Sequence, residues 1–190
     1  MFPISEKHKI FLRLLLLAKA FVNPEKPCGV RDYLRDVRID SHCNDDHPHC
    51  FIYATDGHML IKITFNDYQN AVSGVYTTKS IQKAFRMNDI SLLAESEETT
   101  LYPDLDRLIP QERGLDRKAE SLPLMSAYLL AQSMQAMGDF FWTIQKHVGV
   151  DIGHHGVHFA RISDTGCCVL EWSIPDKSIE IQIGIMPMRG

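Results

Sequence analysis

The first 22 residues show the apolar spacing of an amphipathic helix. Apolar side chains recur every three or four positions, at Ile10, Leu14, Leu17 and Phe21. This spacing places them on one face and predicts a helix over residues 5–22, with Ser5 as its N-cap. Proline cannot continue helical hydrogen bonding, so the helix is expected to end before Pro24 and Pro27.

Shorter apolar or alternating segments follow and are typical of strands. The Asp56-Gly57 pair between two of them is a hairpin signal. A brief helix carrying Lys79, Lys83 and Arg86 is predicted over residues 79–87. The predicted strands in this part of the chain cover residues 33–40, 51–54, 59–65 and 75–77.

Residues 95–120 are charged and rich in turn-forming residues, except for the more ordered pattern of residues 101–110. After them, apolar residues at helical spacing predict a helix over residues 124–137, which Gly138 would end. Four strands are predicted in the remaining chain, at residues 141–148, 158–162, 168–174 and 179–185.

Predicted strands therefore outnumber predicted helices. The predicted elements do not alternate between strand and helix, which is the order typical of a parallel sheet. We predict an α+β protein in which antiparallel sheets are backed by two to three helices.

Composition narrows the class of protein. The chain has 190 residues, of which 45% are hydrophobic and 23% charged, and its net charge is −4. These values exclude a disordered chain, and they require any nucleic-acid contact to use a local basic face. Five cysteines, an odd number, do not suit a disulfide framework, and the run Leu14–Leu17 is too short to span a bilayer. A reduced, cytoplasmic protein is the favoured interpretation.

Three short segments carry a resemblance to a known family. They are Ala-Thr-Asp-Gly-His-Met-Leu at 54–60, Tyr-Pro-Asp-Leu-Asp-Arg-Leu-Ile-Pro at 102–110, and Met-Pro-Met-Arg at 186–189. In this order they resemble the ATDGHRL turn, the FPDY-rVlP segment and the terminal MPMR of the bacterial sliding clamp, the β subunit of DNA polymerase III. Residues 29–34 also resemble a strand of the clamp's middle domain. Because a full clamp is about twice as long, the resemblance implies a shortened clamp-like protein, encoded by a phage or mobile element. It implies a clamp-like module over residues 1–112 and a clamp-like half-module over residues 119–190, which we expect to pack as one compact unit.

The resemblance implies that the three segments converge on a pocket for the short linear motifs of polymerases and clamp-loader subunits. An apolar cleft that accepts Leu and Phe anchors is well served by adaptable Met side chains. The sequence departs from the family at Met59, where Arg is usual, and at Gly190, where Leu is usual. The implied pocket residues are Thr55, Gly57, His58, Leu60, Pro103, Leu108, Met186, Pro187, Met188 and Arg189.

Contact with double-stranded DNA, independent of sequence, is a second implication of the resemblance. Clamps present helices whose basic residues touch phosphates, and the candidates here are Lys9, Arg13, Lys79, Lys83 and Arg86. These residues fit equally well as solvated charges on amphipathic helices. A ring would need several copies of this chain, and the strand at 179–185 is the candidate edge for pairing between copies.

A metal site is the main alternative chemistry. Cys43, His47, His49 and Cys50 are weak candidate zinc ligands, because residues 41–50 lack a CxxC pair and no second ligand pair follows. A hairpin loop is the favoured interpretation of this segment. The chain has no nucleophile elbow, P-loop or zinc-protease motif. We therefore predict a protein that is not an enzyme and needs no cofactor.

Two functional hypotheses follow, with the zinc-binding protein held as a third. The first is a sliding-clamp-like docking or processivity factor in DNA replication. Its partners would be polymerase or clamp-loader subunits and DNA, with further copies of itself but no membrane. The second is a monomeric clamp mimic that sequesters the same partners without encircling DNA. Both keep the pocket, so the mass of the protein in solution is the observation that separates them.

Overall fold

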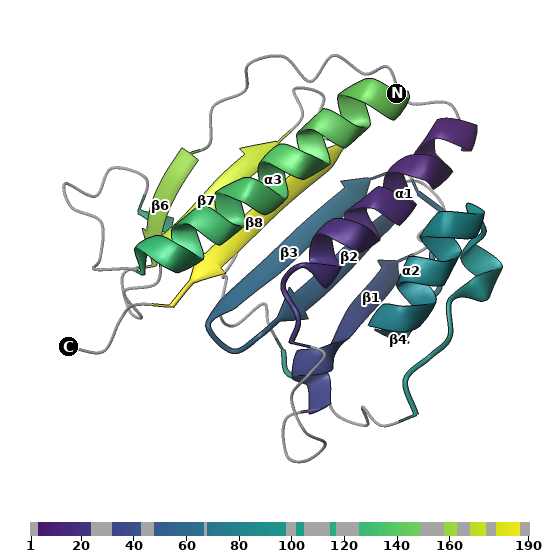
Figure 1. The fold of residues 1–190 in the computed structure, drawn as a ribbon, viewed down its shortest axis with the longest axis horizontal. Helices are drawn as coiled ribbons and strands as arrows, with labels where there is room; N and C mark the ends of the chain where they lie inside the picture. The colour runs from purple at the N-terminus through teal and green to yellow at the C-terminus, as the bar shows by residue number, and fades with distance from the viewer. Residues whose placement is uncertain are drawn as a thin grey trace.

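The computed structural model describes residues 4–23, 32–42, 48–66, 68–97, 102–104, 115–116, 126–148, 158–162, 168–173 and 178–186. These residues form one antiparallel eight-stranded sheet, with three α-helices packed on one of its faces (Figure 1). The helices are α1 (Ile4–Lys19), α2 (Thr78–Met87) and α3 (Ala127–Val148). The strands are β1 (Asp36–His42), β2 (His49–Thr55), β3 (Met59–Asn66), β4 (Gly74–Thr77), β5 (Leu115–Asp116), β6 (His158–Ile162), β7 (Cys168–Ser173) and β8 (Ile179–Ile185). The predicted α+β class is confirmed.

The strand order β4-β1-β2-β3-β8-β7-β6-β5 places β8, the last strand along the chain, beside β3 at the centre of the sheet. β3 pairs with β8, in a register that sets Ile61 opposite Ile183 and Ile63 opposite Ile181. β8 is therefore an interior strand, paired on its other side with β7. The prediction that residues 179–185 form a free edge for pairing between copies is wrong, because both sides of this strand are already hydrogen-bonded.

The two sides of the β3–β8 pair repeat the same arrangement. α1 is followed by the meander β1-β2-β3, and α3 is followed by the meander β6-β7-β8. β4 and β5 add one outer strand to each side. The sheet therefore consists of two helix-plus-meander units joined edge to edge.

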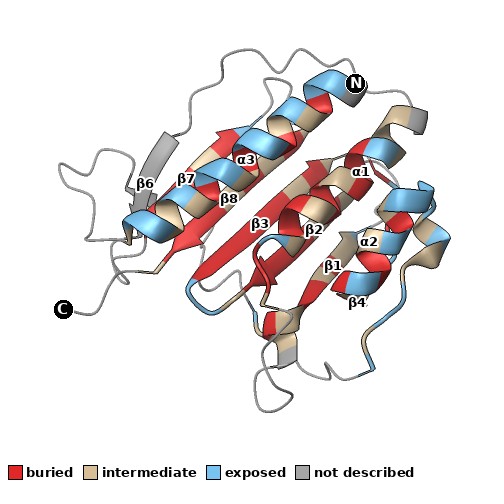
Figure 2. Ribbon diagram, viewed as in Figure 1, coloured by how far each residue is buried: buried red, intermediate tan, exposed pale blue. Residues whose placement is uncertain are grey.

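The core lies between the helices and the face of the sheet that they cover (Figure 2). On this face the period of two places side chains such as Ile52, Ile63 and Ile181, all at most 1% exposed. α1 contributes buried residues including Leu14 and Leu15. Burying one such side chain stabilises the fold by roughly 1.5–3 kcal/mol, so this interface is the main source of stability.

Local signals explain the ends of α2. The Thr77 side chain accepts a hydrogen bond from the backbone N–H of Ser80 at its start. Asn88 ends the helix in the left-handed region, with φ of 50°, and its N–H donates to carbonyls of the last turn. The predicted helices at 5–22 and 79–87 and the strands near 51–54, 59–65, 75–77, 158–162, 168–174 and 179–185 are confirmed within a few residues.

One sequence prediction of secondary structure is wrong. α3 does not end at Gly138 but continues to Val148, over the residues predicted as a strand. Within residues 141–148, polar and apolar residues alternate, but Met137, Phe140 and Ile144 also follow a helical period, and packing against the sheet selects the helix. The strand predicted over residues 33–40 is confirmed with a later start, because residues 32–35 form a 3₁₀ turn and β1 begins at Asp36.

The β4 edge of the sheet is covered by the chain itself. The N–H of Thr77 donates to the carbonyl of Ala94 at 3.3 Å, and the N–H of Ser96 donates to that of Val75 at 2.7 Å. An isolated bridge pairs Tyr76 with Glu95 between them. Residues 94–96 thus occupy hydrogen-bonding groups that an incoming strand would need. None of the helices in the described part of the chain combines the length and hydropathy needed to cross a bilayer.

Gly138 provides a test of the long helix. A Cβ built at this position meets no atom within 4 Å, and glycine within a helix costs about 0.5–1 kcal/mol relative to alanine. Gly138→Ala should therefore raise the free energy of unfolding by about that amount, measured by urea denaturation. Gly57→Ala is the matched control and should lower it, because Gly57 has φ of 92°. Destabilisation by Gly138→Ala would contradict an unbroken α3.

Candidate functional site

The β2–β3 turn is held in shape by its own side chains. Thr55 Oγ1 donates to the carbonyl of Met59 at 2.7 Å and accepts from the N–H of Gly57 at 3.1 Å. Asp56 Oδ1 accepts from the N–H groups of His58 and Met59, both at 2.8 Å. Gly57 supplies the positive φ that the turn requires. The turn is thus rigid, and His58 is exposed at its tip.

The C-terminal segment meets this turn. β8 runs antiparallel to β3 and pairs Ile185 with Met59. One residue further, the N–H of Met186 donates to the carbonyl of His58 at 3.0 Å. The first and third of the three motif segments, 128 positions apart from His58 to Met186, are therefore in direct contact.

The middle segment begins with Tyr102, which lies beside β2 on the sheet face away from the helices. The hydroxyl of Tyr102 lies 3.2 Å from the carbonyl of Tyr53 and 3.5 Å from that of Asp36, and donates to them. Its ring makes an edge contact with Tyr33, with centroids 5.9 Å apart. Burial raises the pKa of Tyr102, so the phenol stays protonated as a donor. Tyr53 immediately precedes the first motif segment, so the start of the second lies beside the start of the first.

The predicted pocket residues differ in exposure. Gly57 and His58 are exposed, Pro103 and Met186 are half-buried, and Thr55 and Leu60 are buried at 5% and 1% exposure. Four predicted pocket residues, Leu108, Pro187, Met188 and Arg189, lie outside the described residues. The turn and the Met186 strand end are thus brought together, with Thr55 and Leu60 beneath the surface rather than lining it.

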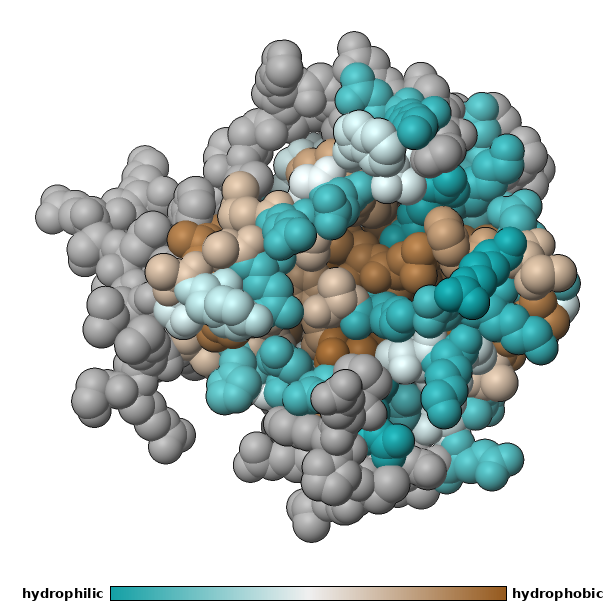
Figure 3. Space-filling view, in the orientation of Figure 1, coloured by the Kyte–Doolittle hydropathy of each residue, from teal (hydrophilic) through white to brown (hydrophobic). Residues whose placement is uncertain are grey.

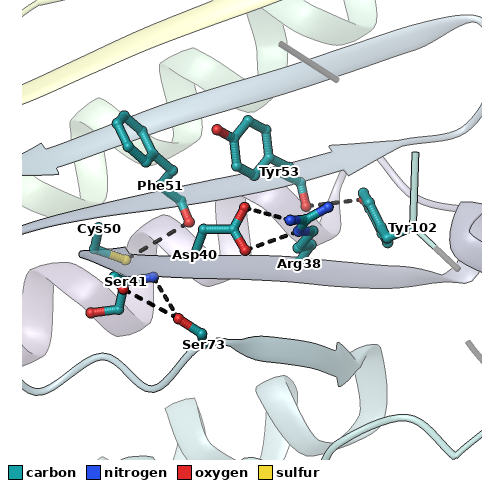
Figure 4. Close-up of polar contacts among 8 residues, drawn as sticks. All are labelled: Arg38, Asp40, Ser41, Cys50, Phe51, Tyr53, Ser73 and Tyr102. Atoms are coloured by element: carbon teal, nitrogen blue, oxygen red, sulfur yellow. Dashed lines mark hydrogen bonds and ion pairs between the residues drawn. The ribbon is translucent and has the colours of Figure 1, made fainter. Parts of the chain in front are cut away.

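Motif reasoning did not identify a charged and aromatic network on the same open face of the sheet (Figure 4). Arg38 and Asp40 form a two-point ion pair, with both N–O distances at 2.9 Å. Partial burial lowers the pKa of Arg38, but the hydrogen bond and charge of Asp40 outweigh this effect and raise it. The Arg38 guanidinium also lies 5.8 Å from the centre of the Tyr102 ring. The alternation of β1 was the only signal, since it places residues 38 and 40 on one face.

Lys62 extends this network along the sheet. Its ammonium lies 5.2 Å from the ring centre of Phe51 and 5.8 Å from that of Tyr53, and the residue is only 7% exposed. Aromatic faces stabilise a cation removed from water. The open face next to the turn is thus an ordered polar surface.

The predicted DNA-contact residues lie on the helix layer, on the opposite side of the sheet. Lys9 on α1 and three residues of α2, Lys79, Lys83 and Arg86, are exposed. Arg13 differs, because it is half-buried, donates to the carbonyl of Lys9 at 3.0 Å and lies 5.7 Å from the centre of the Phe85 ring. Burial lowers its pKa.

The helix layer has a charge opposite in sign to that of the whole protein. The three helices carry eight Lys or Arg residues and two acidic residues, Glu6 and Asp139. Their net charge is therefore +6, in a chain whose net charge is −4. Such segregation concentrates positive potential on one side of the molecule.

The candidate zinc ligands are not arranged for a common ion where the structure describes them. Cys50 is fully buried on the helix side of β2, whereas its neighbour His49 points to the open face, as strand geometry requires. His49 stacks on His42 of β1, with ring centroids 5.2 Å apart. Cys43 and His47 lie outside the described residues. Within the described ranges, no group of three or more His, Cys, Asp or Glu side chains could hold a metal ion.

Comparison with solved structures identifies the type of fold. The beta sliding clamp of C. crescentus superposes with a TM-score of 0.60 at 14% sequence identity, over 96% of this chain and 64% of that one. The DNA polymerase sliding clamp of Pseudomonas aeruginosa gives 0.58 at 16% identity, over 96% and 65%. The fold is sliding-clamp-like.

The assignment of a clamp-like fold rests on structural similarity rather than on overall sequence similarity. No protein-family model and no curated protein matches the sequence. The chain spans slightly less than two thirds of the length of each of the two clamp chains.

Tyr102→Phe tests the attachment of the middle segment in this clamp-like fold. The substitution removes the buried hydroxyl and leaves the Tyr53 carbonyl without that donor. We expect a loss of about 1–2 kcal/mol in the free energy of unfolding, measured by urea denaturation. Tyr128→Phe, at a 74% exposed position, is the matched control and should change little. Equal effects in both variants would show that the hydroxyl contact is not formed.

Proposed function

We propose that this protein is a sliding-clamp-like docking protein of DNA replication, which binds short peptide motifs of polymerase or clamp-loader subunits. The clamp-like fold supports the general role. The observation that carries the peptide site is the hydrogen bond between Met186 and His58, because it joins two of the three motif segments. In this proposal residues 1–112 and 119–190 act as two modules, with the docking site where they meet.

The peptide would lie between the exposed His58 turn and the chain beyond Met186. The proposed contacts are Thr55, Gly57, His58 and Leu60 from the turn, Pro103 and Leu108 from the middle segment, and residues 186–189. The buried Thr55 and Leu60 would support the site from beneath, while the half-buried Met186 and Pro103 offer apolar contact. Met side chains adapt readily to the Leu and Phe anchors of such motifs.

A second part of the proposal concerns DNA. The helix layer carries a net charge of +6, with Lys9, Lys79, Lys83 and Arg86 exposed on it. Phosphate contacts of this kind are independent of sequence and suit a protein that accompanies the replication machinery along DNA.

One observation favours the alternative of a monomeric mimic that sequesters clamp partners. Residues 94–96 cover the β4 edge, and the former candidate edge, β8, is an interior strand. Fewer sheet edges are then open to pairing between copies. A mimic would keep peptide binding but would not need the basic helix layer to contact DNA.

Peptide binding gives the direct test of the docking site. A fluorescent peptide with Leu and Phe anchors should bind with a dissociation constant on the order of micromolar, because a short flexible peptide loses conformational freedom on docking. Deleting residues 187–190 retains Met186 and its bond to His58 but removes one proposed wall. That deletion and Leu108→Asp should each weaken binding about tenfold in fluorescence polarisation.

Val72→Ala, at a 66% exposed position outside the three segments, serves as the control and should bind as the parent does. Absence of saturable binding to the parent would disprove the docking role. If the parent binds and neither variant loses affinity, the peptide occupies a different surface.

Charge reversal tests the DNA role. Replacing Lys9, Lys79, Lys83 and Arg86 by Glu should abolish DNA binding at low salt, and the parent's affinity should fall steeply as salt rises. Exchanging the same four residues between Lys and Arg keeps every charge in place and is the control, with little expected change. Binding that persists after the charge reversal would contradict contact through the helix layer, and no binding by the parent would favour the mimic.

A further inference from the structure

The outward side of α3 differs from those of α1 and α2. It carries few charged residues and exposes aromatic side chains to solvent. Tyr128 is 74% and Trp142 60% exposed. Fourteen residues separate them, so they lie on nearly the same stripe of the helix and about 21 Å apart. The ammonium of Lys146 lies 4.4 Å from the centre of the Trp142 ring. This stripe combines flat apolar surfaces with an adjacent cation.

An apolar groove lies next to the stripe, between α1 and α3. Its volume is about 220 Å³, and its walls are Leu16, Leu17, Ala20, Ala136 and Phe140, with Arg13, Asp139 and Thr143 as polar neighbours. Figure 3 shows this apolar surface among the hydrophilic side chains of the helix layer. Asp139 and Thr143 flank Trp142 in the sequence, so the groove and the aromatic stripe adjoin each other.

Arg13 is the cation at this groove. It is half-buried, and its Nη1 donates to the Lys9 carbonyl at 3.0 Å, which holds the guanidinium in place beside the apolar walls. A nucleobase offers an apolar face that suits these walls and acceptors on its edge that suit a nearby cation.

Duplex DNA keeps the faces of its bases stacked inside the double helix, so these faces are not available to exposed aromatic rings or to an apolar groove. Single strands expose their bases, which stack on aromatic side chains while cations follow the backbone. We propose that the helix layer binds single-stranded DNA, with bases stacked on Trp142 and Tyr128 and one unstacked base in the α1–α3 groove. This inference rests on the DNA-contacting role proposed above and specifies its ligand.

Charged residues of both signs lie around the groove, and their balance decides whether a phosphate backbone is attracted. Asp139 lies at the groove and opposes a phosphate, but Arg13 faces it from α1 and Lys146 follows it on α3. With a net charge of +6 on the layer as a whole, the backbone of the strand is attracted overall. Asp139 also provides an acceptor for an exocyclic amino group of a base in the groove.

Intrinsic fluorescence gives a local probe of this site. The chain has two tryptophans, and the other one, Trp172, is 3% exposed and packs on Phe141 at 4.3 Å. Titration with an oligothymidylate of about 16 nucleotides should therefore quench Trp142 selectively, since stacking brings a base onto its ring. In fluorescence anisotropy, the same labelled strand should bind at least about tenfold more tightly than a duplex of equal charge at the same salt concentration.

Three variants test stacking on Trp142 and occupation of the groove separately. Trp142→Ala should weaken binding of the single strand about tenfold, while Trp142→Phe, which keeps an aromatic face, should lose much less. Ala136→Leu, which fills part of the groove, should weaken binding without removing a charge. Met87→Ala removes a 67% exposed apolar side chain at the end of α2 and is the control, with no expected change. Circular dichroism confirms that each variant keeps its helix content.

The outcomes distinguish this inference from the function on which it rests. Equal affinity for both forms of DNA, with no effect of Trp142→Ala, would overturn the single-strand site and leave a duplex-binding layer. Tighter binding of oligouridylate than of oligothymidylate would overturn it in favour of RNA. No binding of any nucleic acid, with peptide binding intact, would remove both DNA roles and leave the docking function.

Discussion

The antiparallel pairing of β3 with β8 is the interaction on which the rest of the structure depends. It runs from Met59–Ile185 to Phe65–Ile179 and joins two helix-plus-meander units into one sheet. Without this pairing, the backbone hydrogen-bonding groups along one edge of β3 and one edge of β8 would be left open. The same pairing places Met186 at the tip of the β2–β3 turn and sets α1 beside α3. The candidate docking site and the groove of the helix layer are thus both consequences of one strand pair.

The two faces of the sheet are suited to different partners. The open face carries the Arg38–Asp40 ion pair, Lys62 among aromatic rings, and Tyr102 bonded to the backbone of β2. These contacts hold the middle motif segment near the rigid turn, where a peptide would need a preformed surface. The covered face is the core, and the helices above it present cations and exposed aromatics to solvent. In the proposals above, the peptide site lies at the β2–β3 turn and the nucleic-acid site on the helix layer, so the two ligands would not compete.

The net charge of the whole chain does not predict the charge of its helix layer. A chain with a net charge of −4 is not expected to attract nucleic acid, yet its three helices together carry +6. Arg13 shows that the contacts of a basic residue within the helix layer affect its role as much as its charge does. It packs against Phe85 and the groove, and burial lowers its pKa, so it acts at short range rather than as a freely exposed cation.

The sequence by itself determined the elements whose signals are local. Helical spacing identified α1, alternation identified β8, and Asp56-Gly57 identified the β2–β3 turn, because each depends on residues a few positions apart. Tertiary structure decided the rest. Residues 141–148 fit both a strand and a helix, and contact of Phe140 and Ile144 with the sheet selected the helix. The same holds for the location of β8 between β3 and β7, and for which face of β2 is covered by the helices. Pairing partners and packing partners lie far away in the sequence, so no local pattern encodes them.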